Sequence, residues 1–363
     1  MLDPRMPARV SVSAEPLRRD ERLALQSDLA QRGISPSMLA IIPPSGRFFQ
    51  LLRAYDPNGM LLGVTSLMSL RPFVSIKQLL GEGNHVGWDT SIYYTERADR
   101  PKVAAALLNA MARRSMYYAM YFGRIDDDIR AALPLVKHRL LETDYQLGEI
   151  DCRRYSTVDD FLALHKRLRR HLRDHAKAGG TVHVRRGPVE PDLARRFSEL
   201  VLATYRHHGG MGRWLFKDYA RRACGDFFTT CQDAVHIFTE GDDGTVRGLQ
   251  SFVQHSDRLE LSEGGFDRST NTHHAYEAII AESVAYAVAN GLEAVAYGGI
   301  WNPAKDRYCD SENRGKVYLL QLYGNALQYR LAGDRLSRWA FKVYFGGRFA
   351  GASGETTVVS RRS

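Results

Sequence analysis

Two carboxylates, Glu263 and Asp267, stand at the end of a segment that is expected to form a β-strand, residues 258–266. A carboxylate there can act as a general base or orient a cationic amine, although an acidic residue after a strand is also a common turn former. Tyr276 follows on the first turn of an expected helix, where its hydroxyl can bind substrate or its ring can pack in the core. These three residues are candidate catalytic residues.

Basic side chains later in the chain offer phosphate binding and proton transfer. Arg307 and Arg314 can each hold a phosphate through paired hydrogen bonds, or can simply lie in solvent. His273 and His274 precede Tyr276, and histidine is the usual general base near neutral pH. A position at a helix N-terminus disfavours the charged imidazolium, so these two are weaker candidates.

The segment "FLALHKRLRRHLRDHAKAGG" (161–180) predicts a basic amphipathic helix. Its expected apolar stripe consists of Phe161, Leu164, Leu168, Leu172 and Ala176. A second face carries cations: Lys166, Arg170, Arg173 and Lys177, with Arg167 and Arg169 beside them. Residues 153–222 hold 17 Lys or Arg against 7 Asp or Glu, a surplus of 10 that accounts for the whole net charge of +9. A solvated face would explain one such helix, but charge this concentrated favours a phosphate-bearing or polyanionic partner.

Composition excludes several classes of protein. The chain of 363 residues is 44% hydrophobic, and its length suggests two globular domains rather than a disordered chain. It has no run of about 18 apolar residues and no signal-peptide pattern, so we expect a cytoplasmic protein without a membrane span. Cysteines without C-x-x-C or metal-ligand spacing indicate free thiols and no metal site: Cys152, Cys224, Cys231 and Cys309. No P-loop and no Ser/His/Asp arrangement is visible.

The chain repeats one pattern in its two halves. "NGMLLGVTSL" (58–67) and "DGTVRGLQSF" (243–252) share a turn dipeptide, a glycine and an apolar strand. Each is followed by a Gly–aromatic–Asp triplet, a helix and a short strand: 87–89, 101–115 and 117–122 in the first half, and 265–267, 272–290 and 293–298 in the second. Pro101 suits the first turn of one helix, Asn271 or Thr272 can cap the other, and Gly291 can end it.

Hydrophobic periodicity predicts the remaining elements. In the first half we expect strands at 8–17, 47–55, 60–70, 82–94 and 145–155, and helices at 18–32, 36–42 and 126–139. In the second half we expect strands at 181–187, 234–240, 246–255 and 258–266, helices at 190–207, 213–224 and 315–328, and terminal strands to about 345.

One strand, two helices, three antiparallel strands, then helix, strand, helix and strand is the order of the GNAT acyltransferase fold. Two such units joined by a basic helix resemble the Fem-type aminoacyltransferases and related FemAB-like acyltransferases. The likeness in element order covers about residues 8–345. The likeness in sequence is concentrated in 241–324, where "GFDRSTNTHHAYEAIIAESVAYAVANGLEAVAYGG" is followed by Lys305 and Gly315. That order matches the family pattern of a Gly-containing strand, a helix with an early Tyr, a closing Gly, a strand and a Lys.

Two features set this chain apart from relatives with the same fold. Ordinary acetyl-CoA enzymes carry Q/R-x-x-G-x-G/A before the central helix, where backbone N–H groups hold a pyrophosphate. This chain has "DRSTNTHHAYE" (267–277) there and "TERADRPKVAA" (95–105) in the first half, without those glycines. It also lacks the long coiled-coil arm of some Fem enzymes, so it resembles the compact members.

The resemblance implies where the chemistry takes place. In the GNAT fold the strands on either side of the central helix part, which would set Ser262–Gly265 opposite Ala296–Gly298. Direct transfer of an acyl group needs an activated ester, a neutral amine and donors for the oxyanion, with no covalent enzyme nucleophile. Lys305 corresponds to the Fem-type lysine that faces the donor's phosphate or carbonyl, which makes it a further candidate catalytic residue, or it is simply a loop lysine in solvent. The "HHGGMGRW" segment (207–214) can be a lid or a plain connection.

The leading hypothesis is an aminoacyltransferase that uses aminoacyl-tRNA as donor co-substrate, without a further cofactor, and forms an amide or ester bond. The expected acceptor is an amine-bearing small molecule or a peptidoglycan (cell-wall) precursor. The resemblance and the charge pattern assign donor binding to Lys166, Arg169, Arg170, Arg173, Lys177, Arg307 and Arg314. One alternative is an N-acyltransferase that uses acyl-CoA or an acyl-carrier protein. Another is a noncatalytic protein that binds RNA or another polyanion.

The expected fold class is α/β (α+β), with two tandem GNAT-like domains that each have a mixed, mostly antiparallel sheet flanked by helices. The expected boundaries are 1–155 for the N-terminal domain, 156–180 for the basic connecting helix, 181–345 for the C-terminal catalytic domain and 346–363 for a mobile tail.

Overall fold

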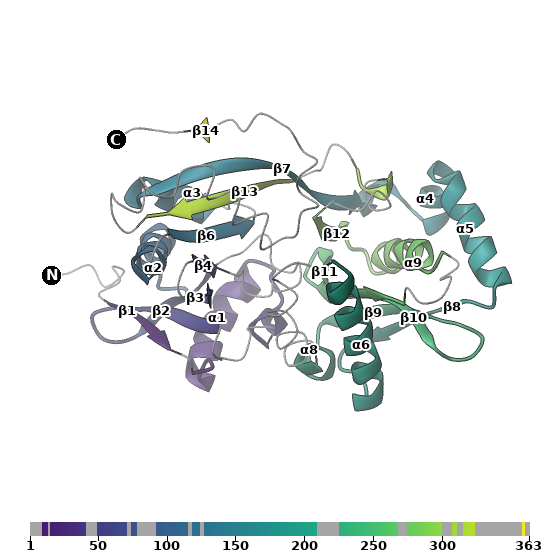
Figure 1. Cartoon of the computed structure of the whole chain (residues 1–363), viewed down its shortest axis with the longest axis horizontal. Coiled ribbons are helices and arrows are strands. Elements are labelled where there is room, and N and C mark those ends of the chain that lie inside the picture. The colour runs from purple at the N-terminus through teal and green to yellow at the C-terminus, as the bar shows by residue number, and fades with distance from the viewer. Residues whose placement is uncertain are drawn as a thin grey trace.

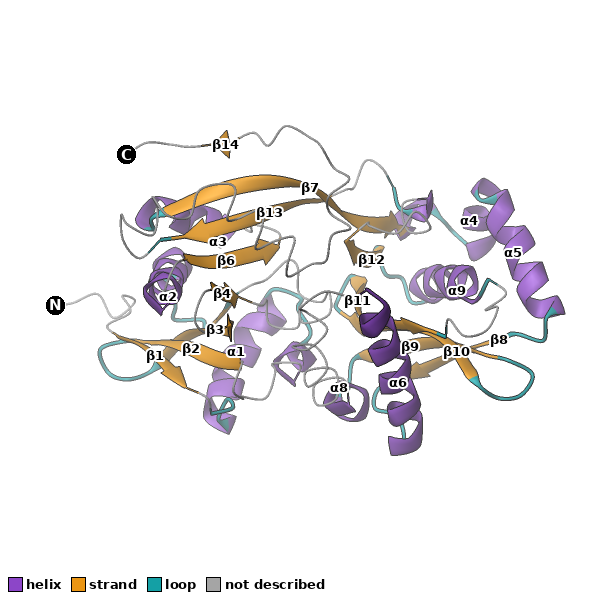
Figure 2. Ribbon diagram, in the orientation of Figure 1, coloured by secondary structure: helices purple, strands orange, loops and turns teal. Residues whose placement is uncertain are grey.

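A computed structural model of the chain describes residues 9–13, 15–40, 49–70, 74–77, 92–114, 118–123, 127–208, 225–267, 274–299, 307–310, 315–323 and 358–359. Strands of one mixed, mostly antiparallel sheet run through it, and helices flank the sheet (Figure 2). The predicted fold class, α/β with a mixed sheet flanked by helices, is confirmed.

The first half contains seven strands, four helices and short 3₁₀ turns within the described residues. The strands are β1 (Arg9–Ser13), β2 (Phe49–Tyr55), β3 (Leu61–Leu70), β4 (Val74–Lys77), β5 (Tyr93–Tyr94), β6 (Tyr118–Gly123) and β7 (His138–Asp151). The helical segments are α1 (Arg19–Gln31), η1 (Pro36–Ala40), α2 (Arg100–Arg114), α3 (Asp127–Ala132), η3 (Leu133–Leu135), η4 (Cys152–Arg154) and α4 (Val158–Leu164).

The second half repeats much of this order in the part that is described. Its helices are α5 (Lys166–Lys177), α6 (Pro191–His208), α8 (Gly225–Thr230) and α9 (Ala275–Ala289). Its strands are β8 (Thr181–Arg186), β9 (Ala234–Glu240), β10 (Val246–Gln254), β11 (Arg258–Phe266), β12 (Ala294–Gly299), β13 (Gly315–Leu322) and β14 (Val358–Val359).

The sheet is continuous across the two halves (Figure 1). Its order is β1-β2-β3-β4-β6-β13-β7-β12-β11-β10-β9-β8, with β5 on β3 and β14 on β7. The long strand β7 connects the halves, because its first part pairs with β13 and its last part, Leu147–Asp151, pairs with β12. Strand β13 comes from the second half of the chain but lies between β6 and β7. Each half therefore contributes a strand to the other.

The halves also share an apolar core. One cluster of buried side chains combines residues of the first half, such as Leu29 and Tyr93, with residues of the second, such as Phe197 and Leu249. Since one sheet and one core run through both halves, the expected division at residues 155 and 181 stays a prediction, as does the tandem arrangement. The expected mobile tail lies outside the described residues, apart from Val358–Val359.

The connecting segment is two helices rather than the single helix that periodicity predicts. Thr157 caps α4, accepting a hydrogen bond from the Asp160 N–H while the Asp160 carboxylate accepts one from the Thr157 N–H. The chain then breaks at His165, whose φ of −113° and ψ of 63° are not helical. The His165 ring packs against Phe161 and Tyr308, which holds the break in place.

This break changes which residues of the basic segment are buried. Phe161 and Leu168 are buried as expected, but Leu164 is 66% exposed and Ala176 is also exposed. The buried face of α5 consists instead of Leu168, His171 and His175. The prediction of one continuous apolar stripe is therefore wrong at two of its five positions.

A second correction concerns residues 315–328, which the apolar spacing predicts as a helix. Residues 315–322 form β13, which is bordered by strands on both sides. A strand in the middle of a sheet shows a nearly continuous apolar run, and "VYLLQL" cannot be told from a buried helix by periodicity. The predicted helix 213–224 and the terminal strands after 324 lie outside the described residues.

Helix α9 is the central helix of the second half, and both of its long faces are covered. It packs on the sheet on one side and against α4 and α5 on the other (Figure 1). Its buried residues therefore surround the helix rather than forming a stripe: Ala275, Ala278, Ile279, Ile280, Ala281, Ser283, Val284 and Ala287. The connecting helices thus complete the core of the second half.

The described cysteines are buried free thiols, as the sequence predicts: Cys152, Cys231 and Cys309. Burial raises the pKa of Cys152 and of Cys231 to about 12, so both are protonated and unreactive at neutral pH. Cys224 lies outside the described residues.

His236 on β9 is a fully buried polar residue in the shared core. Its Nδ1 lies 2.8 Å from Ser251 Oγ, and its Nε2 lies 3.1 Å from the carbonyl oxygen of Gly187. The carbonyl can only accept, so Nε2 carries the proton and Nδ1 accepts from the serine hydroxyl. Burial lowers the pKa of His236 to about 4, so the native protein holds it neutral.

We predict that His236 makes the fold acid-sensitive. In the unfolded chain the histidine is protonated below about pH 6.5. In the native chain its pKa is lowered, so it is protonated only below about pH 4. Stability is therefore complete above pH 6.5 and falls by about 3 kcal/mol as the pH drops to 4. In His236→Gln, which can keep both hydrogen bonds, urea unfolding at pH 7 to 4 should show a shallower loss. An equal pH dependence in both proteins would contradict this.

Candidate active site where two strands part

The site forms where the parallel strands β11 and β12 separate. They pair in register only over Arg258–Glu260 and Ala294–Ala296. Beyond this point β11 continues to Phe266 beside β10, whereas β12 continues to Gly299 beside β7. Residues 261–266 thus face 297–299 across an opening in the sheet, which is where the sequence places Ser262–Gly265 opposite Ala296–Gly298.

An irregularity in each strand marks the point of separation. In β11, Ser251 of β10 pairs with Glu263 and Phe252 pairs with Leu261, so Ser262 is an extra residue in a β-bulge. In β12, Ala296 pairs with Glu149 and Gly298 with Gly148, so Tyr297 is the extra residue. Both bulged side chains are buried, and the Tyr297 hydroxyl is hydrogen-bonded to Ser283 of α9. The bulges lie in the β10–β11 and β7–β12 ladders, on the sides of β11 and β12 that face away from the opening.

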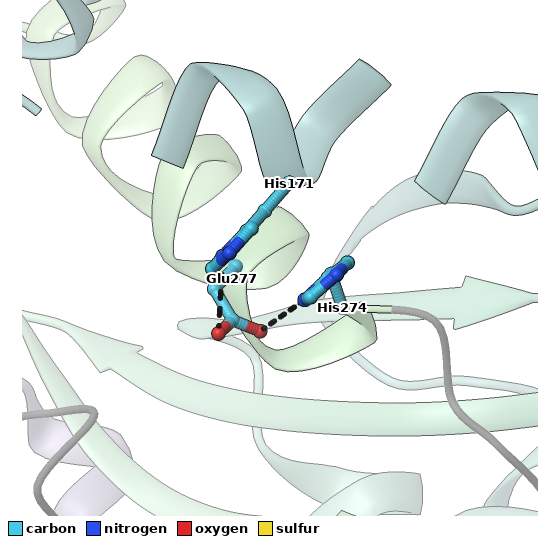
Figure 3. Close-up of side chains that lie close together, drawn as sticks. All are labelled: His171, His274 and Glu277. Carbon is cyan, nitrogen blue, oxygen red and sulfur yellow. Dashed lines mark ion pairs between the residues drawn. The ribbon is translucent and has the colours of Figure 1, made fainter. Parts of the chain in front are cut away.

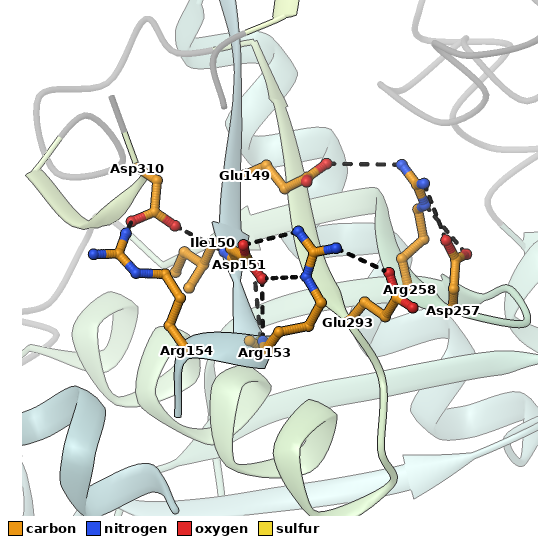
Figure 4. Close-up of polar contacts among 10 residues, drawn as sticks. Glu149, Ile150, Asp151, Arg153, Arg154, Asp257, Arg258, Glu293 and Asp310 are labelled. Carbon is orange, nitrogen blue, oxygen red and sulfur yellow. Dashed lines mark hydrogen bonds and ion pairs between the residues drawn. The ribbon is translucent and has the colours of Figure 1, made fainter. Parts of the chain in front are cut away.

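The closed end of the opening is fixed by polar contacts around the ends of β7, β11 and β12 (Figure 4). The guanidinium of Arg153 donates to both carboxylate oxygens of Asp151 at 2.9 Å and lies 3.5 Å from Glu293. The side chain of Arg153 holds the pKa of Asp151 below its ordinary value. Arg258 bridges in the same way between Asp257 and Glu149. Exposed pairs of this kind stabilise weakly, so their role is to position the strands.

Asp310 is a positioning residue that the sequence analysis did not identify. Its carboxylate accepts hydrogen bonds from the Asp151 N–H at 2.8 Å and from Arg154 Nη1 at 2.7 Å. Its own N–H donates to the Glu149 carbonyl. These contacts attach the segment that follows Lys305 to β7. No local sequence signal marks the residue, because its partners lie about 160 positions earlier.

The bulge at Ser262 reverses which face each side chain of β11 occupies. Before it, Leu259 and Leu261 belong to the cluster around α9. After it, Glu263 pairs with Ser251 and Gly265 with Leu249, whose side chains lie on the α6 face of β10. The bulge therefore turns Glu263 toward α6 rather than α9.

The two predicted base candidates lie in different surroundings. Glu263 is only 2% exposed and lies on the strand that borders the opening. Asp267 is partly exposed, and its carboxylate lies 3.2 Å from Arg247 Nη1, a cation that also pairs with Asp243. The structure thus places Glu263 at the opening and holds Asp267 in a surface ion pair.

Tyr276 lies on the first turn of α9 and points into the protein. Its ring contacts Phe266 of β11 at 5.2 Å, and its hydroxyl is buried near Gln250 and Tyr297. Burial raises the pKa of Tyr276 well above its ordinary value, so the hydroxyl is a hydrogen-bond donor and not a base. The predicted cap, Asn271 or Thr272, is wrong, because the residue that precedes the helix is His274, with a left-handed φ of 64°.

His171, His274 and Glu277 gather at this N-terminus (Figure 3). The two imidazole rings are stacked, with centroids 3.9 Å apart and planes within 5°. Glu277 lies beneath them, with one oxygen 3.4 Å from His171 Nδ1 and the other 3.8 Å from His274 Nδ1. His171 comes from α5, so no local pattern in the sequence links it to residues about 100 positions later.

The cations of α5 lie on its outer surface. Lys166, Arg170, Arg173 and Lys177 are exposed and have no ion-pair partner within the described part of the chain. Arg169 lies 3.6 Å from Asp159. The structure thus confirms a basic exposed face on this helix, while its role in donor binding stays a prediction.

Other predicted residues fall at or beyond the edge of the described chain. Arg307 is exposed, with its guanidinium 6.0 Å from the centre of the Tyr308 ring. Lys305, Arg314, His273 and the segment 209–214 lie outside the described residues. A surface hollow of about 210 Å³ lies away from the parted strands, on the β8–β9–β10 side of the sheet, lined by residues that include Arg186, Asp233 and His255.

Comparison with known proteins identifies the fold. Residues 163–308 match the model of the acetyltransferase (GNAT) domain family. This segment is similar to a GNAT-type domain. It contains the parted strands and the central helix α9, so the chain is an acyltransferase. No protein of curated function matches the sequence.

Solved structures match nearly the whole chain. The C-terminal domain of a protein described as a lysylphosphatidylglycerol synthetase from Agrobacterium fabrum aligns with a TM-score of 0.57 at 14% identity, over 91% of this chain and 99% of that one. L-PGS from Bacillus licheniformis aligns with a TM-score of 0.56 at 11% identity, over 92% and 98%. FemX aligns with a TM-score of 0.47 at 11% identity, over 85% and 92%. The first two likenesses show that both halves together form a known fold.

Among the helices that the structure describes, none combines the length and the apolar character that crossing a bilayer requires.

We predict that Gly265 is required for packing at the site, whereas its neighbour Gly264 is not. A Cβ on Gly265 would lie 2.6 Å from Leu200 O and Val201 N, so α6 would have to move away from β11. A Cβ on Gly264 would lie no closer than 3.6 Å to Leu249 O. Gly265→Ala should cost at least about 2 kcal/mol of unfolding free energy in thermal or urea unfolding. Gly264→Ala, the matched control, should change it by less than about 0.5 kcal/mol. Equal effects would contradict the close approach of α6.

Proposed function

We propose that the protein is an aminoacyltransferase that takes an aminoacyl group from aminoacyl-tRNA and forms an amide or ester bond on an acceptor held between its two halves. The observation that carries the proposal is the opening between β11 and β12, together with a helix N-terminus that is poorly suited to a pyrophosphate.

The parted strands provide what acyl transfer requires. A carbonyl placed between β11 and β12 would lie against the backbone of both strands, beyond the point where their mutual pairing ends at Glu260 and Ala296. Backbone N–H groups that are already oriented stabilise a developing oxyanion without reorganisation. An aminoacyl ester is activated enough to react by direct attack, so no covalent enzyme intermediate is needed.

The start of α9 supports a donor other than coenzyme A. A pyrophosphate cradle uses free N–H groups and the positive end of the helix dipole. Here Glu277 stands in the first turn, only 15% exposed, and the rings of His171 and His274 lie over it. Its carboxylate already uses the favourable dipole and would repel a diphosphate. An aminoacyl-tRNA brings phosphates that can be bound elsewhere.

Helix α5 offers that second place. It packs directly against α9, so its exposed cations lie beside the helix that borders the site. Transfer RNA is a dense polyanion, and exposed Lys and Arg supply most of the affinity for such a ligand. We therefore assign donor binding to Lys166, Arg169, Arg170, Arg173 and Lys177, together with Arg307 and Arg314, and keep Lys305 as a candidate catalytic residue.

Glu263 is our choice for the general base. Its buried position at the opening, on the face toward α6, lets it accept a proton from an acceptor that approaches from that side. Asp267, held by Arg247, is better suited to fixing the end of β11.

The acceptor is the least constrained part of the proposal. Two of the aligned structures are described as a lysylphosphatidylglycerol synthetase and as L-PGS, and the first of these names denotes an aminoacyl ester of a phospholipid. A lipid headgroup hydroxyl therefore joins the amine of a small molecule or cell-wall precursor as a candidate acceptor. The alternative remains an acyl-CoA or carrier-protein donor, which would bind the same cations.

The first prediction concerns the donor. A mixture of aminoacyl-tRNAs should lose its amino acid to phosphatidylglycerol vesicles or to a cell-wall precursor in the presence of the protein, while CoA thioesters should release no thiol. Replacing four α5 cations by glutamine should weaken tRNA binding at least tenfold at low salt. The slope of log affinity against log salt should fall by about 0.7–0.9 for each phosphate that the variant no longer neutralises. The four are Lys166, Arg170, Arg173 and Lys177.

The control removes the same charge elsewhere. Four exposed cations of the first half, Arg97, Arg113, Arg130 and Lys137, can be changed to glutamine together. This variant should bind tRNA nearly as the unaltered chain does. If both variants lost tRNA affinity equally, the α5 cations would contribute only through the net charge of the protein and not as a specific binding surface. Thiol release from a CoA thioester, with no transfer from charged tRNA, would overturn the proposal.

The second prediction separates the two carboxylates. Glu263→Gln should lower kcat by about 10²–10⁴ with little change in KM, because it removes a base and keeps the shape. Asp267→Asn should lower kcat by less than about tenfold, because that carboxylate holds a surface ion pair. A flattened pH–rate profile in Glu263→Gln alone would distinguish a base from a packing residue. The reverse ranking would assign the base to Asp267.

A further inference from the structure

The cluster at the start of α9 has distances that do not suit hydrogen bonds. His171 Nδ1 and His274 Nδ1 lie 3.4 and 3.8 Å from the two oxygens of Glu277. Good N–H···O bonds are about 2.7–3.2 Å long. Ligands around a tetrahedral ion with bonds of about 2.0–2.1 Å lie about 3.3–3.5 Å apart, which is close to the observed spacing. The three ligand atoms all lie within 4.8 Å of one another.

His171 adds an independent observation. Its side chain is only about 5% exposed, yet its Nδ1, which faces Glu277, has no hydrogen-bond partner among the described residues (Figure 3). A buried polar atom without a partner is costly and calls for a ligand.

The backbone conformation of His274 also supports a ligand-binding role for this cluster. Among the described residues, His274 is the one non-glycine residue with a positive φ, 64°. Such a conformation costs free energy, and it is often kept where a side chain must be aimed at a ligand. Here it brings the His274 ring into contact with the ring of His171 from a different helix.

We propose that His171, His274 and Glu277 form a binding site for a divalent transition metal ion, with Zn²⁺ as the best match. Two imidazole nitrogens and one carboxylate are a usual ligand set for zinc, and hard ions such as Mg²⁺ and Ca²⁺ prefer oxygen ligands. Three protein ligands leave at least one position for water or an anionic group. The ion would also join α5 to α9, since His171 and the other two ligands come from different helices.

Arg167 sets the state of the empty site. Its Nε–H points at His171 Nε2, 3.4 Å away, which favours the tautomer with the proton on Nδ1. A metal on Nδ1 requires the opposite tautomer, so the exposed Arg167 side chain must turn aside when the ion binds. Arg167 therefore weakens metal binding but does not block it.

The experiment titrates the full-length protein, stripped with a chelator, with Zn²⁺ by calorimetry and with Co²⁺ by visible absorption. We expect one ion per chain and the intense absorption of tetrahedral Co²⁺. His274→Gln and Glu277→Gln should each weaken metal binding at least about 100-fold. Substitution of residues that only hydrogen-bond to a metal ligand already lowers metal affinity about 10–100-fold. Arg167→Gln should tighten it severalfold, and weaker binding there would overturn the assignment of Nδ1 as ligand.

A matched control comes from another histidine–carboxylate pair. His183 Nε2 lies 3.2 Å from Glu240 Oε2 on the surface, but only one histidine is present there. His183→Gln should bind the metal as the unaltered protein does. His274 is 37% exposed, so its replacement should leave the circular dichroism spectrum unchanged. The proposal fails if no ion binds in a one-to-one ratio, or if His274→Gln and His183→Gln bind it equally.

Discussion

The site depends on a competition for one strand. Strand β12 can form hydrogen bonds with β11 on one side and with β7 on the other, but the two neighbours diverge. Up to Ala296, β12 pairs with both β11 and β7. Beyond the bulge at Tyr297 it pairs, among the described strands, only with β7, where Gly298 and Gly299 lie opposite Gly148 and Leu147. Strand β11 remains with β10 through the bulge at Ser262. The opening is thus a consequence of sheet pairing, and it exists whether or not a substrate is present.

This competition explains why the site needs both halves of the chain. The strand that draws β12 away is β7, from the first half, and β7 is itself held by β13, from the second. The halves also share a core that contains Leu29, Tyr93, Phe197 and Leu249. An isolated second half would lose the partner that opens its sheet. The family model ends at residue 308, before β13, although solved structures with this fold match more than nine tenths of the chain.

Sequence periodicity and turn signals located several strands correctly although both of their faces are buried, but periodicity alone did not distinguish every buried strand from a helix. They located β9, β10 and β11 within a residue, but periodicity predicted a helix where β13 lies between two strands. It also located the opening, through the resemblance to the GNAT order. It did not reveal the break at His165, because a turn held by the packing of its own ring leaves no capping signal. Nor did it associate His171 with Glu277, since only the packing of α5 on α9 brings them together.

The N-terminus of α9 decides which anions the site can accept. The positive end of a helix dipole can be neutralised by a phosphate or by a side chain, and here Glu277 occupies the first turn. A carboxylate at this place disfavours a phosphate where acetyl-CoA enzymes bind one. A divalent ion on the same three ligands would reverse the sign of that charge and offer a coordination position to an oxygen of the donor. The proposed donor preference and the inferred metal site therefore both depend on the carboxylate of Glu277. Substitution of Glu277 should change both the choice of donor and the affinity for the metal ion.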